Sequence, residues 1–138
     1  MIHSETISLR TKGFSDILDV TQQVDAVVGR SKIQNGLVTL FCPGSTGALT
    51  TIEYESGVLR DLQKAVEKIV PSNIPYEHDR RWGDGNGFSH VRAALIKPSL
   101  TVPLIKGKLI LGTWQQIVFT DFDNRRRNRN ILVHIIGE

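Results

Sequence analysis

The sequence contains a single cysteine, Cys42, among its 138 residues, so no disulfide bond can form within the chain. Aromatic residues make up only 7% of the chain, and no apolar run approaches the roughly 20 residues that a membrane-spanning helix needs. The first residues lack the basic and apolar segments of a secretory signal. These absences lead us to expect a cytoplasmic protein with no membrane partner.

Positive charge barely exceeds negative charge, with 17 Lys and Arg residues against 14 Asp and Glu residues and a net charge of +3. Four of the 17 are Arg125, Arg126, Arg127 and Arg129, and without them the count is 13 against 14, a net charge of −1. A protein that binds nucleic acid normally spreads its cations along a face and interleaves aromatic residues, whereas this cluster contains none. Nucleic-acid binding through the arginine cluster is therefore the weakest hypothesis, and we expect no nucleic-acid partner.

The hydrophobic periodicity predicts one domain, residues 1–138, with elements in the order β-β-α-β-β-α-α-β-β-β. The expected strands cover residues 5–10, 17–20, 37–42, 49–55, 100–104, 109–122 (broken or bulged near Gly112) and 131–135, and the expected helices cover 22–31, 57–70 and 89–96. The last three strands follow one another and are joined by hairpins. This arrangement predicts an α+β fold with mostly antiparallel strands.

Residues 71–89 read as a long loop, and loops of that length in a compact domain are usually functional. The loop and the residue after it gather five possible ligands: His78, Asp79, Asp84, Asn86 and His90. Two imidazoles and carboxylate oxygens can hold a divalent ion of the zinc or manganese type. The twelve-residue separation of the histidines matches no established metal motif. The alternative is that the glycines shape a turn and both histidines lie on the surface.

Small residues with hydroxyl groups follow the strand predicted to end at Cys42, in the run Pro43-Gly44-Ser45-Thr46-Gly47. Such a bend can present backbone N–H groups and side-chain oxygens to a phosphate or a carboxylate, but it is not a Walker loop because no Lys-Ser/Thr pair follows a glycine. The alternative is a plain turn. Cys42 can act as a metal ligand or a nucleophile, or it can be a small buried hydrophobic residue.

Two further segments carry candidates. Glu53, on the polar side of a predicted strand, can serve as a ligand or general base, or it can be an exposed strand carboxylate. Gln115 can bond a ligand if a bulge at Gly112 re-aims the side chains after it, and Trp114 is expected in the core.

The arginine cluster can bind phosphate oxygens or carboxylates in a bidentate manner. Asp121 and Asp123 lie just upstream and can neutralise part of it. A solvated hairpin tip or a salt-bridge network at a subunit contact is the alternative interpretation.

Taken together, these segments resemble the YjbQ family, also called the secondary thiamine-phosphate synthase family. The strings that carry the resemblance are Ala48-Leu49-Thr50 with Glu53, Arg60-Asp61-Leu62, Val70-Pro71, Tyr76-Glu77-His78-Asp79, Asp84-Gly85-Asn86-Gly87-Phe88-Ser89-His90, Pro98-Ser99-Leu100-Thr101-Val102-Pro103, Gly107-Lys108-Leu109, Leu111-Gly112-Thr113-Trp114-Gln115-Gln116-Ile117 and Ile136-Gly137-Glu138.

The resemblance implies a β-sandwich of two sheets with helices packed at one side, and assembly as a homotrimer. It also implies a weak thiamine-phosphate synthase activity, which joins hydroxymethylpyrimidine diphosphate to thiazole phosphate, at a histidine-rich metal cleft. His78 and His90 stand at the family's histidine positions. Many members carry a further histidine where this chain has Gly44-Ser45-Thr46-Gly47, so either Cys42 takes over a ligand role or the site has changed.

On this basis the expected cofactor is a divalent metal, zinc or magnesium, and the expected partner is a phosphorylated small molecule. The expected metal ligands are His78, His90, Asp84 and Cys42; the expected catalytic residues are His78, His90 and Glu53; the expected phosphate-binding residues are Ser45, Thr46, Asn86, Gln115, Arg126 and Arg127. The alternative function is a non-catalytic, trimeric protein that binds a metal or a small anion.

Overall fold

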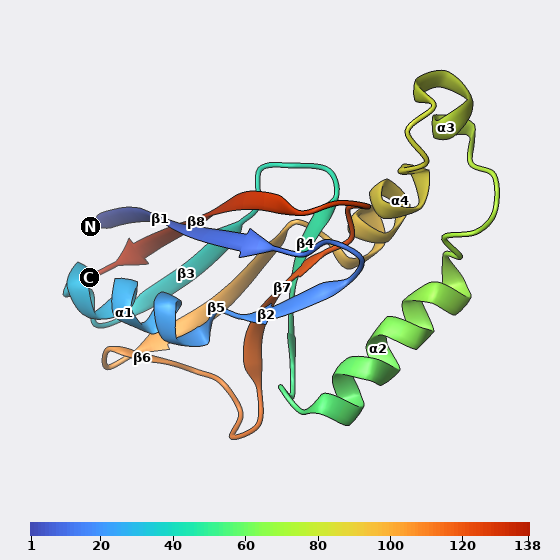
Figure 1. Ribbon diagram of the computed structural model, residues 1–138. Coiled ribbons are helices and arrows are strands. Elements are labelled where there is room, and N and C mark those ends of the chain that lie inside the picture. The colour runs from blue at the N-terminus through green and yellow to red at the C-terminus, as the bar shows by residue number, and fades with distance from the viewer.

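The computed structural model describes residues 1–138 and contains eight strands and four helices (Figure 1). The strands are β1 (Ile2–Thr11), β2 (Asp16–Asp19), β3 (Gly36–Phe41), β4 (Gly47–Ile52), β5 (Ser99–Ile105), β6 (Lys108–Leu109), β7 (Gln116–Asp121) and β8 (Arg127–Gly137), and the helices are α1 (Thr21–Ser31), α2 (Ser56–Ile69), α3 (Glu77–Trp82) and α4 (Gly87–Ile96). Every strand pair is antiparallel. The predicted α+β class with two sheets is confirmed.

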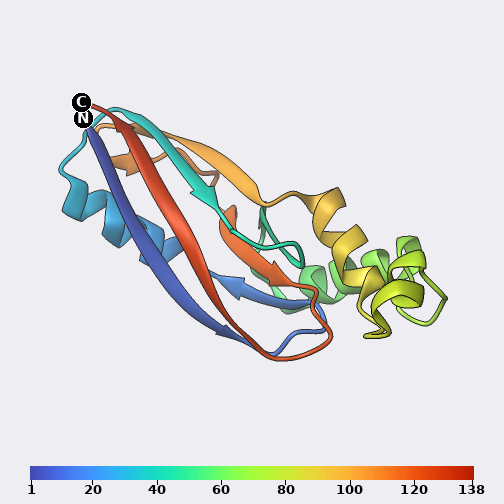
Figure 2. The same ribbon diagram turned by 90° about the horizontal axis from the view of Figure 1, so that it is seen from above.

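The larger sheet has the strand order β1-β8-β3-β5-β6. Its longest pairing joins β1 to β8, from Ile2 opposite Ile136 to Thr11 opposite Arg127, and these two strands run side by side over their whole length in Figure 2. Side chains alternate between the two faces of a strand, so Val133 and Ile135 are buried on the inner face while Ile136 points outward. The alternation of apolar and polar residues in the sequence of these strands therefore indicates that only one face of the sheet is buried.

The smaller sheet, β2-β7-β4, packs against the inner face of the larger one. Phe119 on β7 and Leu49 on β4 join α1 and the larger sheet in a core of 17 buried residues. On the other side of β4, Ala48 packs with Val66 of α2 and Ala93 of α4. The small sheet is thus enclosed by the large sheet and α1 on one face and by α2 and α4 on the other. No helix combines the length and the apolar character needed to cross a membrane.

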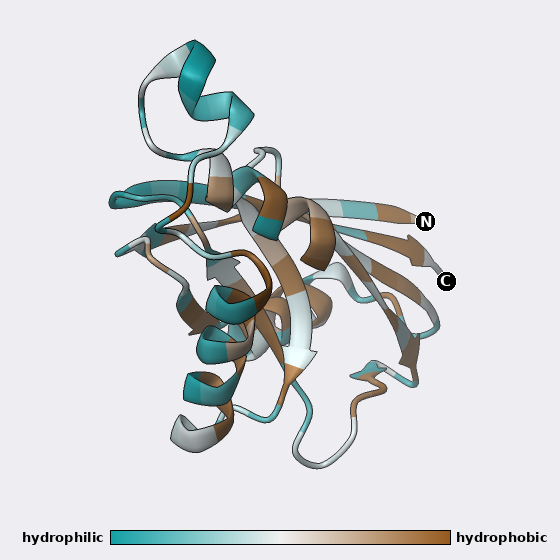
Figure 3. Ribbon diagram, turned by 90° about the vertical axis from the view of Figure 1, so that its right-hand side faces the viewer, coloured by the Kyte–Doolittle hydropathy of each residue, from teal (hydrophilic) through white to brown (hydrophobic).

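Two segments differ from the expectation. The predicted loop 71–89 contains the short helix α3, which projects from the body of the molecule and is largely hydrophilic (Figures 1 and 3). The predicted long strand 109–122 is interrupted by residues 110–115, which loop away from the sheets (Figure 1). Trp114 lies in that loop and is 72% exposed, so its expected place in the core is wrong. The sequence predicts burial because Trp114 is a bulky aromatic residue within the predicted strand 109–122. In the structure β6 ends at Leu109 and β7 begins at Gln116, so Trp114 lies in neither strand.

Candidate metal centre

Helices α3 and α4 are joined by a four-residue turn that folds one helix back onto the other. Gly83 and Gly85 adopt left-handed φ values of +66° and +63° in this turn, a conformation that L side chains rarely take. The amide of Gly87 then donates a hydrogen bond of 2.8 Å to Asp79 Oδ1. A Cβ atom on Gly87 would lie 2.6 Å from the Cβ atom of Tyr76, so the close approach of the two helices requires glycine there.

This fold-back brings the two histidines together. The ring centroids of His78 on α3 and His90 on α4 lie 4.4 Å apart, with an interplanar angle of 37°. The pKa of His90 is lowered from its ordinary value because burial, and then the charge of His78, disfavour the imidazolium. Side chains twelve positions apart in the sequence therefore share one site, with His90 biased towards the neutral form that binds metals or accepts protons.

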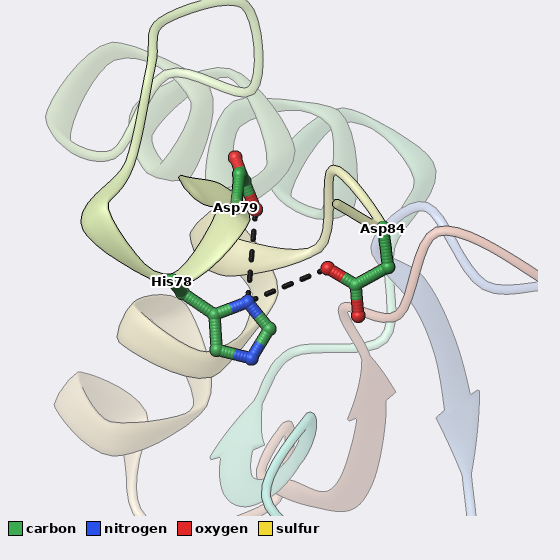
Figure 4. Close-up of side chains that lie close together, drawn as sticks. All are labelled: His78, Asp79 and Asp84. Atoms are coloured by element: carbon green, nitrogen blue, oxygen red, sulfur yellow. Dashed lines mark ion pairs between the residues drawn. The ribbon is translucent and has the colours of Figure 1, made fainter. Parts of the chain in front are cut away.

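The His78 ring also lies close to the carboxylates of Asp79 and Asp84 (Figure 4). Its Nδ1 atom lies 3.4 Å from Asp84 Oδ1 and 3.6 Å from Asp79 Oδ1, and the ligand atoms of the three residues all lie within 4.8 Å of one another. The Nδ1 atom is buried and has no hydrogen-bond partner. Zinc holds nitrogen and oxygen ligands at about 2.0–2.2 Å, so tetrahedral ligand atoms lie roughly 3.3–3.6 Å apart. The two distances from His78 Nδ1 match that spacing, and the two carboxylate oxygens lie within 4.8 Å of each other.

Asn86 holds the turn in place. Its Oδ1 atom accepts a hydrogen bond of 3.1 Å from the backbone amide of Asn124 and another from the Ser89 hydroxyl. Asn124 in turn donates through Nδ2 to the carbonyl of Asp84, at 2.9 Å. Asn86, which the sequence suggested as a phosphate ligand, is buried and its carbonyl oxygen is occupied. Its observed contacts tie the turn between α3 and α4 to the end of β7.

A cavity of about 190 Å³ opens beside His90 and extends to the bend before β4. Its lining residues are Gly44, Ser45, Gly47, His90, Ala93, Ala94 and Pro98. Ser45 is exposed at this cavity. Thr46 points the other way, because its buried hydroxyl donates to Asp123 Oδ2 at 3.0 Å and accepts from Arg129 at 2.6 Å. Of the two hydroxyl residues predicted to bind phosphate, only Ser45 faces the cavity.

Buried ion pairs lie beneath this bend. Arg129 contacts Asp121 at 2.7 Å, and Arg127 contacts Asp123 at 3.0 Å. Burial alone would raise the pKa of Asp123, but hydrogen bonds from Arg127 and Thr46 lower it overall. Half of the arginine cluster is therefore built into the fold as an ion-pair network. Arg126, by contrast, is exposed and forms no ion pair.

Three expected site residues lie elsewhere. Cys42 is completely buried in the main core, and burial raises the pKa of its thiol, so it belongs to the packing and not to the histidine cluster. Glu53 follows the far end of β4, roughly 17–20 Å along the strand from the cavity at about 3.3 Å per residue. Gln115 donates to Thr51 Oγ1 at 3.0 Å in the exposed loop before β7.

Asp79 is one of the five possible ligands that the sequence offers, but it is the one member of this cluster absent from the four expected metal ligands. Its place next to His78 was visible in the sequence, but adjacent residues in a loop carry no information about a shared direction. In the structure both residues lie in helix α3, and the folded chain places Asp79 Oδ1 3.6 Å from His78 Nδ1. Recognising Glu77–Trp82 as a helix followed by a left-handed glycine would have been the useful signal.

A family model described as UPF0047 protein YjbQ-like matches residues 5–138 of the chain. The chain belongs to this family. A UPF0047 protein from Methanothermobacter thermautotrophicus is 38% identical over 137 residues, which cover 99% of this chain and 94% of the relative. A UPF0047 protein from Archaeoglobus fulgidus is 40% identical over 126 residues, covering 91% and 96%.

The fold of this chain is also similar to that of solved structures. The crystal structure of a YbjQ-like protein of unknown function from Sulfolobus solfataricus superimposes with a TM-score of 0.94 at 30% identity, covering 100% of this chain and 99% of the other. A hypothetical protein from Aeropyrum pernix has a TM-score of 0.91 at 27% identity, with 99% of each chain covered. The YjbQ resemblance read from the sequence is confirmed, for a family whose function is not established.

Proposed function

We propose that the chain binds a divalent metal ion at His78, Asp79 and Asp84 and acts on a phosphorylated small molecule in the cavity beside His90. The observation that carries this proposal is the buried, unpartnered Nδ1 atom of His78, which lies 3.4 Å and 3.6 Å from two carboxylate oxygens. A hydrogen bond would bring these atoms to about 2.7–3.2 Å. One imidazole and two carboxylates suit zinc, and the carboxylates also suit magnesium.

The reaction we propose is of the thiamine-phosphate synthase type. The bond between the methylene carbon of the pyrimidine and its diphosphate oxygen breaks, the thiazole nitrogen forms the new bond to that carbon, and pyrophosphate leaves. A divalent ion supplies positive charge for the negative charge that develops on the leaving group. Ser45 offers its hydroxyl to a phosphate oxygen at the cavity, and His90 holds or releases a proton there.

The size of the cavity favours the alternative function. At about 190 Å³ it is smaller than the roughly 300–1,000 Å³ typical of small-molecule sites, while the synthase reaction needs two phosphorylated precursors at once. A non-catalytic metal- or anion-binding protein needs no such room. For the synthase reaction, we propose that a second copy of the chain completes the site.

Metal content tests the first part of the proposal. Purified wild type, His78→Ala and Asp84→Ala are compared by elemental analysis, with His134→Ala as a matched control because His134 lies on β8, bonded to Ser4 and away from α3. We expect bound zinc or another divalent ion in wild type and in the control, and loss of it in the other two variants. Equal metal content in all four proteins would contradict the proposal.

Turnover tests the second part. Metal-loaded protein is incubated with hydroxymethylpyrimidine diphosphate and thiazole phosphate, and thiamine phosphate is measured by chromatography. We expect product that disappears after chelation of the metal and in Asp84→Ala. Retained metal without product in wild type would reject the synthase and support the binding function.

A further inference from the structure

A second hollow lies at the opposite end of β1 from the amino terminus, where that strand leaves its pairing with β8. It has a volume of about 390 Å³ and is lined by Arg10, Thr11, Lys12, Arg126, Arg127 and Asn128. No hydrophobic residue lines it. None of the six residues belongs to the metal cluster or to the cavity beside His90. This hollow is therefore a separate feature of the molecule.

Positive charge around this hollow is largely uncompensated. Arg127 pairs with Asp123, but the side chains of Arg10, Lys12 and Arg126 form no ion pair and no hydrogen bond. Asp16, four residues after Lys12, accepts a hydrogen bond from the backbone amide of Lys12 and does not pair with its side chain. Cations held within the Debye length of about 10 Å repel one another. An anion in the hollow would remove that repulsion.

The strand pairing fixes where these cations point. Arg10 lies opposite Asn128, and Thr11 lies opposite Arg127. The Thr11 hydroxyl is buried and donates to Asp121 Oδ2 at 2.6 Å, so the side chains of Arg10 and Asn128, which alternate with it, lie on the outward face. Arg127 keeps its Nε donor buried without an acceptor. The free donors at the hollow are therefore the outward side chains of Arg10 and Asn128, with Lys12 and Arg126 just beyond the two strand ends, while the Arg127 guanidinium pairs with Asp123.

We propose that this hollow binds a small, multiply charged phosphate anion, with inorganic pyrophosphate as the simplest example. Guanidinium groups match phosphate oxygens in bidentate geometry, and three or four cations match the charge of a diphosphate better than that of a single carboxylate. The lining offers no apolar or aromatic surface for a base or a ring. Recognition therefore centres on the phosphate groups, and a nucleic acid, which needs stacking platforms, fits less well. The site goes beyond the proposed metal-dependent function and does not depend on it.

Titration calorimetry with pyrophosphate, in chelator and without divalent metal, tests this site. Wild type, Arg10→Gln, Arg126→Gln and His78→Ala are compared, with Arg60→Gln on the exposed face of α2 as a matched loss of one charge. We expect binding to wild type, His78→Ala and Arg60→Gln with equal affinity. We expect about tenfold weaker binding to each of the other two variants, the loss produced by removing one charge-assisted contact.

Three further measurements make the result decisive. In amide NMR spectra, pyrophosphate should shift the resonances of residues 10–12 and 126–128, and affinity should fall as salt rises from about 0.02 to about 0.2 M. A single-stranded oligonucleotide forms the second arm of the experiment. The proposal is overturned by the absence of pyrophosphate binding, by equal affinities in Arg10→Gln and Arg60→Gln, or by an oligonucleotide that binds where pyrophosphate does not.

Discussion

At the scale of single residues, neighbouring arginines in one short segment have different environments. Arg129 lies against the fully buried Asp121, and Arg127 reaches Asp123, while Arg126 stays in solvent. A buried carboxylate is tolerated only when donors compensate for its lost hydration. The two aspartates therefore decide which arginines serve the fold and which are free to meet a ligand.

Replacement of Asp123 by Asn tests this network. Because hydrogen bonds lower the pKa of Asp123 below 3.8, the unfolded chain binds more protons than the folded one, and this contribution to stability is present above pH 3.8 and lost as the pH falls through the folded pKa. At neutral pH we expect Asp123→Asn to reduce the free energy of unfolding by about 2–3 kcal/mol, at the lower end for a broken buried pair because Arg127 is partly exposed.

Urea unfolding of wild type and Asp123→Asn at pH 7 and at about pH 3 measures this difference, which should shrink in acid. Asp61→Asn on the exposed face of α2 is the control and should change stability by less than about 0.5 kcal/mol. A difference between wild type and Asp123→Asn that is the same at both pH values would show that the ionised carboxylate contributes nothing.

At the scale of elements, the site depends on the angle between two short helices. Neither α3 nor the turn after it contributes a buried residue to the main core. The arrangement rests on left-handed glycines, on the contact of Gly87 with Tyr76, and on hydrogen bonds through Asn86 and Asn124. The proposed metal site is thus attached to the sandwich by local contacts, and we expect that it can be disturbed while the core stays folded.

Gly87→Ala is expected to separate α3 from α4. The added Cβ atom would lie 2.6 Å from Tyr76 Cβ, and relieving such a clash costs about 1–3 kcal/mol. We expect weaker metal binding, measured by competition with a chromogenic chelator, while circular dichroism shows the sandwich intact.

Gly29→Ala is the matched control. Gly29 lies in α1, and nothing is within 4 Å of an added Cβ atom. This change should stabilise the protein by about 0.5–1 kcal/mol, because alanine favours the helix, and should leave metal affinity unchanged. Equal metal affinities for both variants would show that the helix–helix contact does not position the ligands.

At the scale of the whole molecule, the larger sheet has one face in the core and one face outside. A row of apolar side chains crosses the outer face, with Ile136 paired to Ile2 on one side and to Leu37 on the other. These three are 55%, 69% and 52% exposed. Contiguous exposed apolar side chains of this kind mark interaction surfaces, and we propose this row as the contact surface of the homotrimer.

Leu37→Lys is expected to disrupt that assembly, because three copies of a charge would have to enter an apolar contact. Size-exclusion chromatography with light scattering should give a trimer for wild type and a smaller species for Leu37→Lys. Ile74→Lys, an equally drastic change in the exposed loop before α3, should leave the trimer intact. A wild-type monomer, or a trimeric Leu37→Lys variant, would contradict the proposal.

The sequence alone determined the identity and order of most elements. Alternation at Ile7 and Leu9, the helical stripe around Val66 and the turn signal before Leu37 all reflect the local geometry of strands, helices and turns. These periods depend on neighbours a few positions away, so they can be read without coordinates. The family strings located both histidines for the same reason, since a motif is also a local pattern.

Only the tertiary structure decided which of these residues meet. The occupied hydroxyl of Thr46, the burial of Cys42 and the exposure of Trp114 arise from packing between segments distant in the chain. The approach of His78 to Asp84, six residues later, arises from the turn that folds α3 back onto α4. The hollow proposed to bind a phosphate anion also depends on distant segments, because Arg10 pairs with Asn128, 118 positions later. Such contacts depend on how the two sheets and four helices fit together in three dimensions, and no local pattern encodes that fit.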